Sequence, residues 1–330
     1  QQLFDGTALQ ASHDLASALS GSFTSTEFQF FGLKMRYQPL NEDWETQMWL
    51  EEVAQRIFLA LQQSNFGSES NQLYQDLVVF GTGCMWMESI IAPSGGFGGL
   101  RFRTMPPGKY VITEEFDGTI RTVAREFSLP AHACLSQWNK SCSDKLKEKA
   151  EKSSDEMIAI LHTMQPFKDR QSDRQQFESR YFEKENKTEL AATAYRNFRY
   201  LVPRWDKASD EEYGSGQGDV AYPDTASLNR AVEMRFKQWA KAIDPPILTV
   251  DDGVIGKLRM TAGTRTVVRN LDSVREFQTS AKFDVAQFQE SQLRQMIRNA
   301  FFAAQIQLPD KPYMTAFEIQ SLLEIMQRRL

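Results

Sequence analysis

The segment that most restricts the fold is residues 284–330, for which one long helix, a proline-containing loop and a second helix are predicted. Apolar residues recur at helical spacing along its first half, and neither glycine nor proline interrupts the pattern before Pro309. Thr315 and Glu318 then form a capping-box pattern, in which the hydroxyl accepts from a backbone amide and the carboxylate reaches back. We therefore predict helical rods joined by loops, which is the architecture of a scaffold rather than of a catalytic domain.

The overall charge argues against a protein that grips nucleic acid tightly. The 330 residues include 38 lysines and arginines against 43 acidic residues, which gives a net charge of −5. Proteins that bind in a DNA groove usually carry a basic excess. The 23 Phe, 9 Tyr and 6 Trp residues are compatible with a large core or with large subunit contacts, and the sequence leaves both open.

Cysteine usage and hydropathy exclude two further classes of protein. The three cysteines, Cys84, Cys134 and Cys142, give an odd count without a CxxC pair. We therefore expect neither a disulfide framework nor a zinc site, and we expect the thiols to be reduced. No apolar run approaches the length of a membrane span. Because the chain begins without Met and ends within a helical pattern, we expect it to continue in both directions within a longer reading frame.

The first eighty residues predict helices around one short strand. A helix is expected over 4–20, with Asp5 or Thr7 as its cap and Gly21 as its end. The other expected elements are a strand over 28–37, an amphipathic helix over 41–63 capped by Asn41, and a helix over 68–80.

The middle of the chain changes to the period of strands. Residues 83–128 predict one antiparallel sheet, with hairpin turns at the glycine cluster 95–99 and at Asp117-Gly118. Further on we expect a helix over 131–138, a Lys-rich stretch, strands over 157–164, 176–183 and 198–202, and a polar turn over 169–174.

A second helical unit is predicted after the loop 202–224. Its helix covers 225–242, with Thr225 or Ser227 as the cap, and Pro245-Pro246 stops it. Short strands are expected over 247–275, with turns at Asp252-Gly253 and Ala262-Gly263. With the helix over 284–307, the predicted order is helix, small β unit, helix.

Two glycine-rich stretches have the composition of phosphate-binding loops but not their spacing. GGFGG (95–99) lacks the GxxxxGK[ST] spacing and precedes a strand rather than a helix, which favours a hairpin. YGSGQGD (213–219) lacks both that ending and a dinucleotide spacing, which favours a tightly turned or flexible approach to the next helix.

Catalytic and metal-binding patterns are also missing, so we expect no enzyme, no cofactor and no metal. His13, His132 and His162 are far apart and fit no zinc motif. The adjacent acids at 114–115, 211–212 and 251–252 point apart, and solvated loops explain them better than a catalytic dyad.

Three cations remain as candidates for contact with a polyanion. Lys311 lies in the proline-containing loop, while Arg294 and Arg298 share one face of the preceding helix at i, i+4 spacing. The alternative for all three is an exposed helix surface and an ordinary turn.

Several long segments resemble the head-to-tail connecting (portal) proteins of short-tailed, T7-like bacteriophages. The likeness extends from about Phe4 to Leu330, and no catalytic motif belongs to it. The segments that carry it include NEDWETQMWLEEVAQRIFLALQQSNF, QLYQDLVVFGTGCMWME, GGLRFRTMPPGKYVITEEFDGTIRTVAREF, YLVPRWDKASDEEYGSGQGDVAYPDTASLNR, AIDPPILTVDDGVIG and LPDKPYMTAFEIQSLLE.

The resemblance implies an α+β portal fold. It combines a mixed α/β wing, a stem of two helices, a small β-rich clip and a tunnel loop, and it assembles into a ring. Carried over, the parts are a wing over 1–223, stem helices over 224–243 and 284–307, a clip over 244–283, a tunnel loop over 308–314, and the start of a wing or crown-side helix over 315–330. The chain ends where the family's crown or barrel is expected.

The implied function is that of one subunit of a dodecameric ring at a capsid vertex, through which a separate terminase packages genomic double-stranded DNA and from which the DNA is later ejected. The implied partners are other copies of the chain, terminase, the major capsid and scaffolding proteins, and tail adaptor or nozzle proteins. The expected location is the virion, without a membrane, and the host cytoplasm during assembly.

The implied sites are of three kinds. The tunnel-loop residues expected nearest the DNA are Pro309, Asp310, Lys311, Pro312 and Tyr313. Arg294 and Arg298 are the stem candidates that face the channel, and the residues expected to dock a tail adaptor or terminase from the clip are Asp251, Asp252, Lys257, Arg259 and Arg265.

A conduit for DNA needs weak, repeated phosphate contacts rather than a tight grip, and a net charge of −5 fits that requirement. The alternative function is a ring-forming structural adaptor that bridges head and tail without touching DNA.

Overall fold

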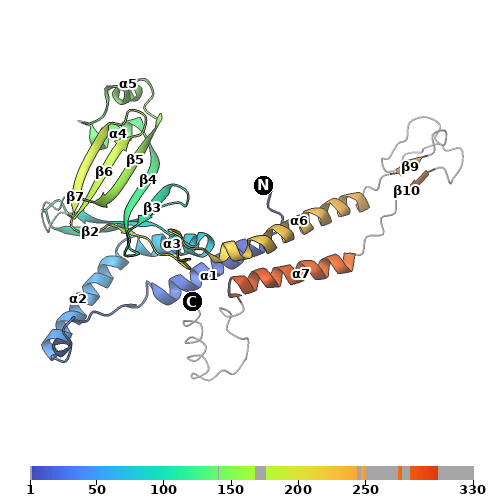
Figure 1. Cartoon of the computed structure of the whole chain (residues 1–330), viewed down its shortest axis with the longest axis horizontal. Helices are drawn as coiled ribbons and strands as arrows, with labels where there is room; N and C mark the ends of the chain where they lie inside the picture. The colour runs from blue at the N-terminus through green and yellow to red at the C-terminus, as the bar shows by residue number, and fades with distance from the viewer. Residues whose placement is uncertain are drawn as a thin grey trace. The chain divides into compact units, whose positions relative to one another are not determined.

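Figure 1 shows the computed structural model of the protein, which describes residues 2–139, 141–167, 176–243, 247–249, 274–276 and 283–303. The chain divides into two compact units. The described part of the larger unit lies within residues 12–220, and that of the smaller unit lies within 2–11 and 221–303. The division falls inside two helices, α1 (Thr7–Phe23) and α6 (Gln217–Ile243).

Helix α2 (Trp44–Gln62) begins at a different cap from the one expected. The Asp43 carboxylate accepts a hydrogen bond from the Thr46 amide at 3.0 Å, which satisfies a free donor of the first turn. The expected cap, Asn41, ends a short 3-10 helix (Gln38–Asn41) and hydrogen-bonds instead to the backbone of Met35. The strand expected over 28–37 is wrong, because the structure has no strand in this segment.

Two glycines next to helices behave differently. Gly81 ends α3 (Phe66–Phe80) in the left-handed conformation, with φ of 71°, and its amide donates to the Leu77 carbonyl at 2.9 Å. We expected Gly21 to end α1, but the helix continues past it to Phe23. A glycine inside a helix costs only about 1 kcal/mol relative to alanine, so neighbouring contacts outweigh it.

Residues 83–128 form strands, but the expectation of a single sheet is wrong. The first sheet has the order β2-β1-β8, with β1 (Met85–Ile91), β2 (Phe97–Thr104) and β8 (Tyr200–Leu201). The second has the order β3-β4-β5-β6-β7 and is antiparallel throughout. Its strands are β3 (Tyr110–Glu114), β4 (Ile120–Pro130), β5 (Met157–Pro166), β6 (Phe177–Glu183) and β7 (Glu189–Tyr195).

Both predicted hairpins are confirmed. The glycine cluster connects β1 to β2, and the Ala92 amide donates to the Gly96 carbonyl at 2.8 Å. Asp117-Gly118 connects β3 to β4 with Gly118 at φ 79°, a conformation that glycine adopts without strain. The Asp117 carboxylate accepts from the Thr119 amide at 3.0 Å, which fixes this second turn.

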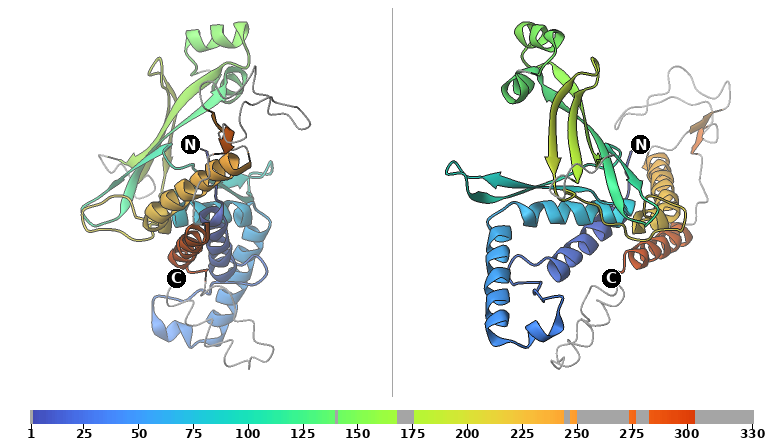
Figure 2. Two further views of the ribbon diagram at one scale, coloured as in Figure 1. Left: turned by 90° about the vertical axis from the view of Figure 1, so that its right-hand side faces the viewer. Right: turned by 60° about the vertical axis from the view of Figure 1, so that its left-hand side comes forward.

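The core of the larger unit forms several hydrophobic clusters. One surrounds Trp86, Tyr110 and Tyr200 where the two sheets meet. Another lies under α4 (Ala131–Trp138) and α5 (Asp144–Lys152), which cover one end of the five-stranded sheet (Figures 1 and 2). The predicted helix over 131–138 is confirmed, and the Lys-rich stretch is helical as well. All three cysteines are buried and free.

The smaller unit contains most of α6, all of α7 (Phe283–Ala300), and the antiparallel pair β9 (Ile247–Thr249) and β10 (Val274–Glu276). The predicted order of helix, β strands and helix is therefore present among the described residues.

Three bounds in this region differ from expectation. Helix α6 begins at Gln217, and Thr225 is not its cap but donates from its hydroxyl to the Ala221 carbonyl at 2.8 Å inside the helix. Helix α7 ends at Ala300 rather than 307, because Phe302 adopts a left-handed φ of 56°. The predicted turns at 169–174, 252–253 and 262–263, the tunnel loop and the helix over 315–330 lie outside the described residues. The assignments to wing, stem and clip stay predictions.

Candidate functional site

Helices α6 and α7 run side by side and are joined by a buried carboxylate (Figure 1). Arg235 of α6 lies 2.6 Å from the Glu290 carboxylate of α7, and Arg294 approaches the same carboxylate at 3.4 Å. Glu290 is only 1% exposed. A buried carboxylate is stable only when charge and hydrogen bonds compensate it, and here two guanidinium groups do so.

The N-terminal segment is held against the same two helices. Arg294 donates from Nε and Nη2 to one oxygen of Asp5, both at 3.0 Å. Burial alone raises the pKa of Asp5, but hydrogen bonds from Thr7 and Arg294 outweigh burial and hold that pKa below its ordinary value. The Phe4 amide also donates to Asn229 of α6 at 2.7 Å. Residues near the start of the chain therefore bind to both helices.

The network is compact but not fully satisfied. Within the described residues, Arg235 Nε and Glu290 Oε1 are buried without a hydrogen-bond partner. The Arg235 guanidinium carbon lies 5.0 Å from the centre of the Trp239 ring, which adds a cation–π contact. In a polar network that is already partly unsatisfied, removal of one further member leaves more buried polar atoms without a partner and lowers the stability of the fold.

The two arginines predicted to share one face have different surroundings. Arg294 is half-buried and bound to Asp5 and Glu290. Arg298, one turn later, is exposed and has no ion pair within the described residues. A contact of either residue with DNA stays a prediction, although Arg298 is the more available.

The remaining predicted site residues lie outside the described residues. They are the tunnel-loop residues Pro309, Asp310, Lys311, Pro312 and Tyr313 and the clip residues Asp251, Asp252, Lys257, Arg259 and Arg265. Their proposed roles stay predictions.

The glycines of 213–219 make close backbone contacts that sequence reasoning missed. A Cβ on Gly216 would lie 2.6 Å from the Gly81 amide nitrogen and 2.7 Å from the Val78 carbonyl oxygen. One on Gly218 would overlap the Val79 carbonyl. Glycine at alternate positions was the visible signal, because only glycine permits two backbones to approach so closely.

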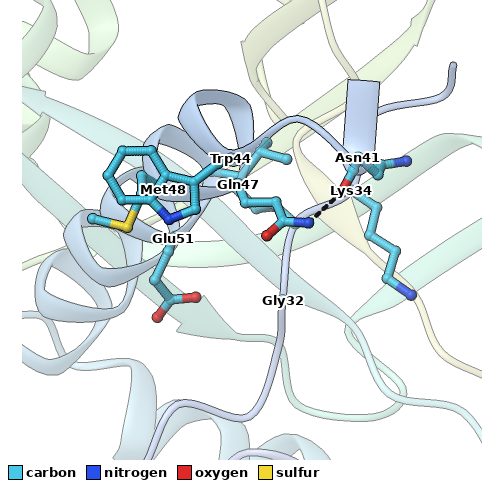
Figure 3. A pocket seen from close by; sticks show the side chains of 9 residues that line it. Gly32, Lys34, Asn41, Trp44, Gln47, Met48 and Glu51 are labelled. Carbon is cyan, nitrogen blue, oxygen red and sulfur yellow. Dashed lines mark hydrogen bonds between the residues drawn. The ribbon is translucent and has the colours of Figure 1, made fainter. Parts of the chain in front are cut away.

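Helix α2 exposes large apolar side chains, with Trp44 and Met48 one turn apart on one face and Trp49 on a neighbouring face. Trp44, Trp49 and Met48 are 70%, 56% and 55% exposed. Trp44 and Met48 line a hollow of about 410 Å³ with Lys34 and Glu51 among its polar residues (Figure 3). Aromatic and Met side chains with a polar rim are typical of protein–protein contacts.

Of the adjacent acids at 114–115, Glu114 does not lie in the expected solvated loop but at the end of β3, and Glu115 lies in the following turn. Glu114 is mostly buried and accepts hydrogen bonds from Lys207, at 2.5 Å, and from Arg204. These hydrogen bonds, that from Lys207 first, lower the pKa of Glu114. Glu114 therefore forms a structural ion-pair site with Lys207 and Arg204.

Other chemistry is limited in the part of the chain that the structure describes. No group of three His, Cys, Asp or Glu side chains there is placed to hold a metal ion, and no helix there is long and apolar enough to cross a bilayer. Burial raises the pKa of the Cys84 thiol to about 12 and that of Cys134 to about 11, so both are protonated at neutral pH.

Residues 1–329 match the family described as "Bacteriophage head to tail connecting protein". The chain is 25% identical over 261 residues to a "Probable portal protein" of Bordetella phage BPP-1, and the match covers 74% of this chain and 45% of that protein. The chain therefore spans about half the length of this relative.

Two solved structures have low overall similarity to this chain. The first, from "Neck of native GTA particle computed with C12 symmetry", gives a TM-score of 0.36 at 10% identity and covers 79% of this chain and 62% of that chain. The second, from "Virion of native gene transfer agent (GTA) particle", gives 0.37 at 11% identity and covers 92% and 72%.

Proposed function

Because the chain belongs to the family of bacteriophage head-to-tail connecting proteins, we propose that it is a portal subunit. Twelve copies form a ring at one capsid vertex, terminase packages genomic DNA through the ring, and the DNA leaves through it on infection. The observation that carries the proposal is the family match over nearly the whole chain. A short-tailed, T7-like virion, contacts with capsid and scaffolding proteins, and docking of tail adaptors on the clip belong to the same proposal.

The helix pair α6 and α7 is the proposed stem. In this arrangement the buried Arg235–Glu290 pair keeps the two helices together, while exposed cations such as Arg298 face the channel. Weak contacts of this kind leave the duplex free to move, because each tight contact with a phosphate would have to be broken before the DNA could advance. The net charge of −5 is consistent with a conduit.

Ring closure requires two different surfaces on each subunit, since contacts within a cyclic ring of this kind are heterologous. The exposed apolar surface of α2, with Trp44 and Met48 on one face and Trp49 beside them, is one proposed surface. Aromatic anchors that are exposed in the single chain become buried when the neighbouring copy covers them.

Electron microscopy of the purified protein, viewed down its symmetry axis, tests the proposal. We expect a closed ring of twelve subunits with a channel wide enough for a DNA duplex. Rings with a narrower channel would favour the structural adaptor that never touches DNA. Monomers or open oligomers would contradict the proposed assembly.

The role of the tunnel loop is tested by Lys311→Glu in a packaging assay. We expect rings to assemble normally while packaging or retention of DNA falls, because the change replaces an attractive charge with a repulsive one. Lys145→Glu, on an exposed position of α5, is the matched control. Unchanged packaging in the Lys311 variant would remove that residue from the mechanism.

A further inference from the structure

Arg125 of β4 is a buried cation without a counter-charge. It is 7% exposed, and no carboxylate lies within 4.0 Å of its guanidinium among the described residues. Its Nε–H donates to His162 Nδ1 at 3.2 Å, and Nη1 donates to the Met105 sulfur at 2.9 Å. Its guanidinium carbon also lies 4.6 Å from the centre of the Phe127 ring. All of these partners lack a formal negative charge if His162 is neutral.

The surroundings of His162 keep it neutral. Burial, and then the neighbouring Arg125 charge, lower its pKa to about 3. Its Nδ1 lies 2.8 Å from the Tyr200 hydroxyl and also accepts from Arg125, while Nε2 lies 2.8 Å from the Ser179 hydroxyl. The proton therefore lies on Nε2, from which it is donated to Ser179. The imidazole orients Arg125 but does not compensate its charge.

A cavity of about 240 Å³ adjoins Arg125 and brings two further cations to it. Arg103 of β2 and Lys109, just before β3, line the cavity together with Arg125. Neither forms an ion pair within the described residues. The acidic residue in the lining is Glu126, whose carboxylate already binds Lys184 at 2.6 Å. The cavity thus gathers positive charge in a chain whose net charge is −5.

We propose that this cavity binds an oxyanion, a phosphate or a carboxylate, held by Arg125, Arg103 and Lys109. A guanidinium presents its N–H groups in a planar fork that matches the oxygens of such anions, and Lys109 supplies a point charge. A desolvated arginine binds an anion more strongly than an exposed one, because the local dielectric constant is lower. The anion is either free in solution or a carboxylate side chain of a neighbouring copy.

Calorimetric titration of the whole chain with inorganic phosphate, at constant ionic strength, tests the site. We expect saturable binding of one phosphate per chain. The double variant Arg103→Gln/Lys109→Gln removes two exposed cations and leaves the buried network in place. It should weaken binding by about tenfold for each cation, as expected for charged hydrogen bonds.

The matched control is Arg101→Gln/Lys145→Gln, which removes the same charge from exposed positions outside the cavity. We expect its affinity for phosphate to equal that of the unmodified chain. The proposal is overturned if the unmodified chain shows no saturable binding, or if the cavity variant binds as well as the control.

The source of the anion is distinguished by repeating the titration on dissociated chains and on assembled rings. Binding to both forms indicates a free anion. If only dissociated chains bind phosphate, and the rings of the cavity variant dissociate more readily than those of the unmodified chain, the anion is a carboxylate of the neighbouring copy. The first titration does not require rings, so failure of the proposed assembly and failure of the anion site are separate results.

Discussion

Arg235 and Glu290 form a 2.6 Å ion pair between α6 and α7 in which the carboxylate is almost completely buried. Arg294 completes the compensation of this carboxylate from one turn further along α7 and also binds Asp5. A single carboxylate therefore holds together two helices, and the cation beside it holds the N-terminal segment.

Replacing Glu290 by Ala should lower the free energy of unfolding by about 3–5 kcal/mol, since the half-buried Arg235 guanidinium loses its counter-charge and Arg294 keeps only Asp5. Urea denaturation measures the loss, and hydrogen exchange should locate it in α6 and α7. The control is Glu233→Ala, which breaks the exposed i, i+4 pair with Lys237. We expect the control to change stability by less than about 1 kcal/mol, and equal losses in the two variants would contradict a special role for Glu290.

Replacing Arg294 by Gln should destabilise the chain by about 1–3 kcal/mol because charged hydrogen bonds to Asp5 are lost. Arg298→Gln, an identical change on an exposed position, should leave thermal unfolding unchanged. If Arg298 contacts DNA, its variant should instead impair packaging at normal stability. A loss of stability in the Arg298 variant would show that its surroundings differ from those described.

Replacing Gly218 by Ala should destabilise the larger unit by about 1–3 kcal/mol, because the added methyl group overlaps the Val79 carbonyl. Gly21→Ala is the matched control, since Gly21 also lies in a helix and a Cβ there meets nothing within 4 Å. That change should stabilise the protein by about 0.5–1 kcal/mol. Thermal unfolding should thus show changes of opposite sign, and the same sign in both would rule out the close-packing explanation.

The pH dependence of stability should reveal Asp76 of α3. Burial raises the pKa of this carboxyl to about 6 against the opposing hydrogen bond from Gln72, and within the described residues one of its oxygens has no partner. The folded state therefore binds the proton more tightly than the unfolded state, whose pKa is 3.8. As pH rises through the interval between these values, the folded state loses stability, and above it the loss is complete.

Asp76→Asn removes this titration while nearly preserving the shape of the side chain. Its stability relative to the unmodified chain should increase by about 1–3 kcal/mol between pH 4 and pH 7. Urea denaturation at a series of pH values gives this difference and cancels the contribution of other groups. A difference that does not change with pH would mean that Asp76 titrates normally.

Replacing Trp44 and Trp49 together by Ala should weaken assembly while the single chain stays folded, because both side chains are mostly exposed. At a proposed subunit contact, each buried aromatic anchor contributes about 2 kcal/mol or more to association. Analytical ultracentrifugation measures the fraction of rings, and circular dichroism checks the fold. Unchanged assembly would exclude the exposed tryptophans of α2 as a subunit contact.

Much of the secondary structure could be predicted from the sequence because local signals agreed with tertiary packing. Hydrophobic periodicity located α2 and α3, and glycine in a turn located the β3–β4 hairpin at Gly118. Predictions failed where a strand pairs with another strand from a distant part of the chain or where the local pattern is weak. The strands of 83–128 belong to two sheets, and β7 was missed because its pairing with β6 outweighs a weak local pattern.

The sequence by itself determined the family, most of the succession of helices and strands, and the glycines whose backbone freedom the turns require. Only the tertiary structure decided which charges are compensated. Arg294 binds Asp5 and Glu290, Arg298 is exposed, and Arg125 is buried without a carboxylate. The physical reason is that helical and strand patterns depend on neighbours a few residues away, whereas burial and charge pairing depend on residues brought together from distant parts of the chain.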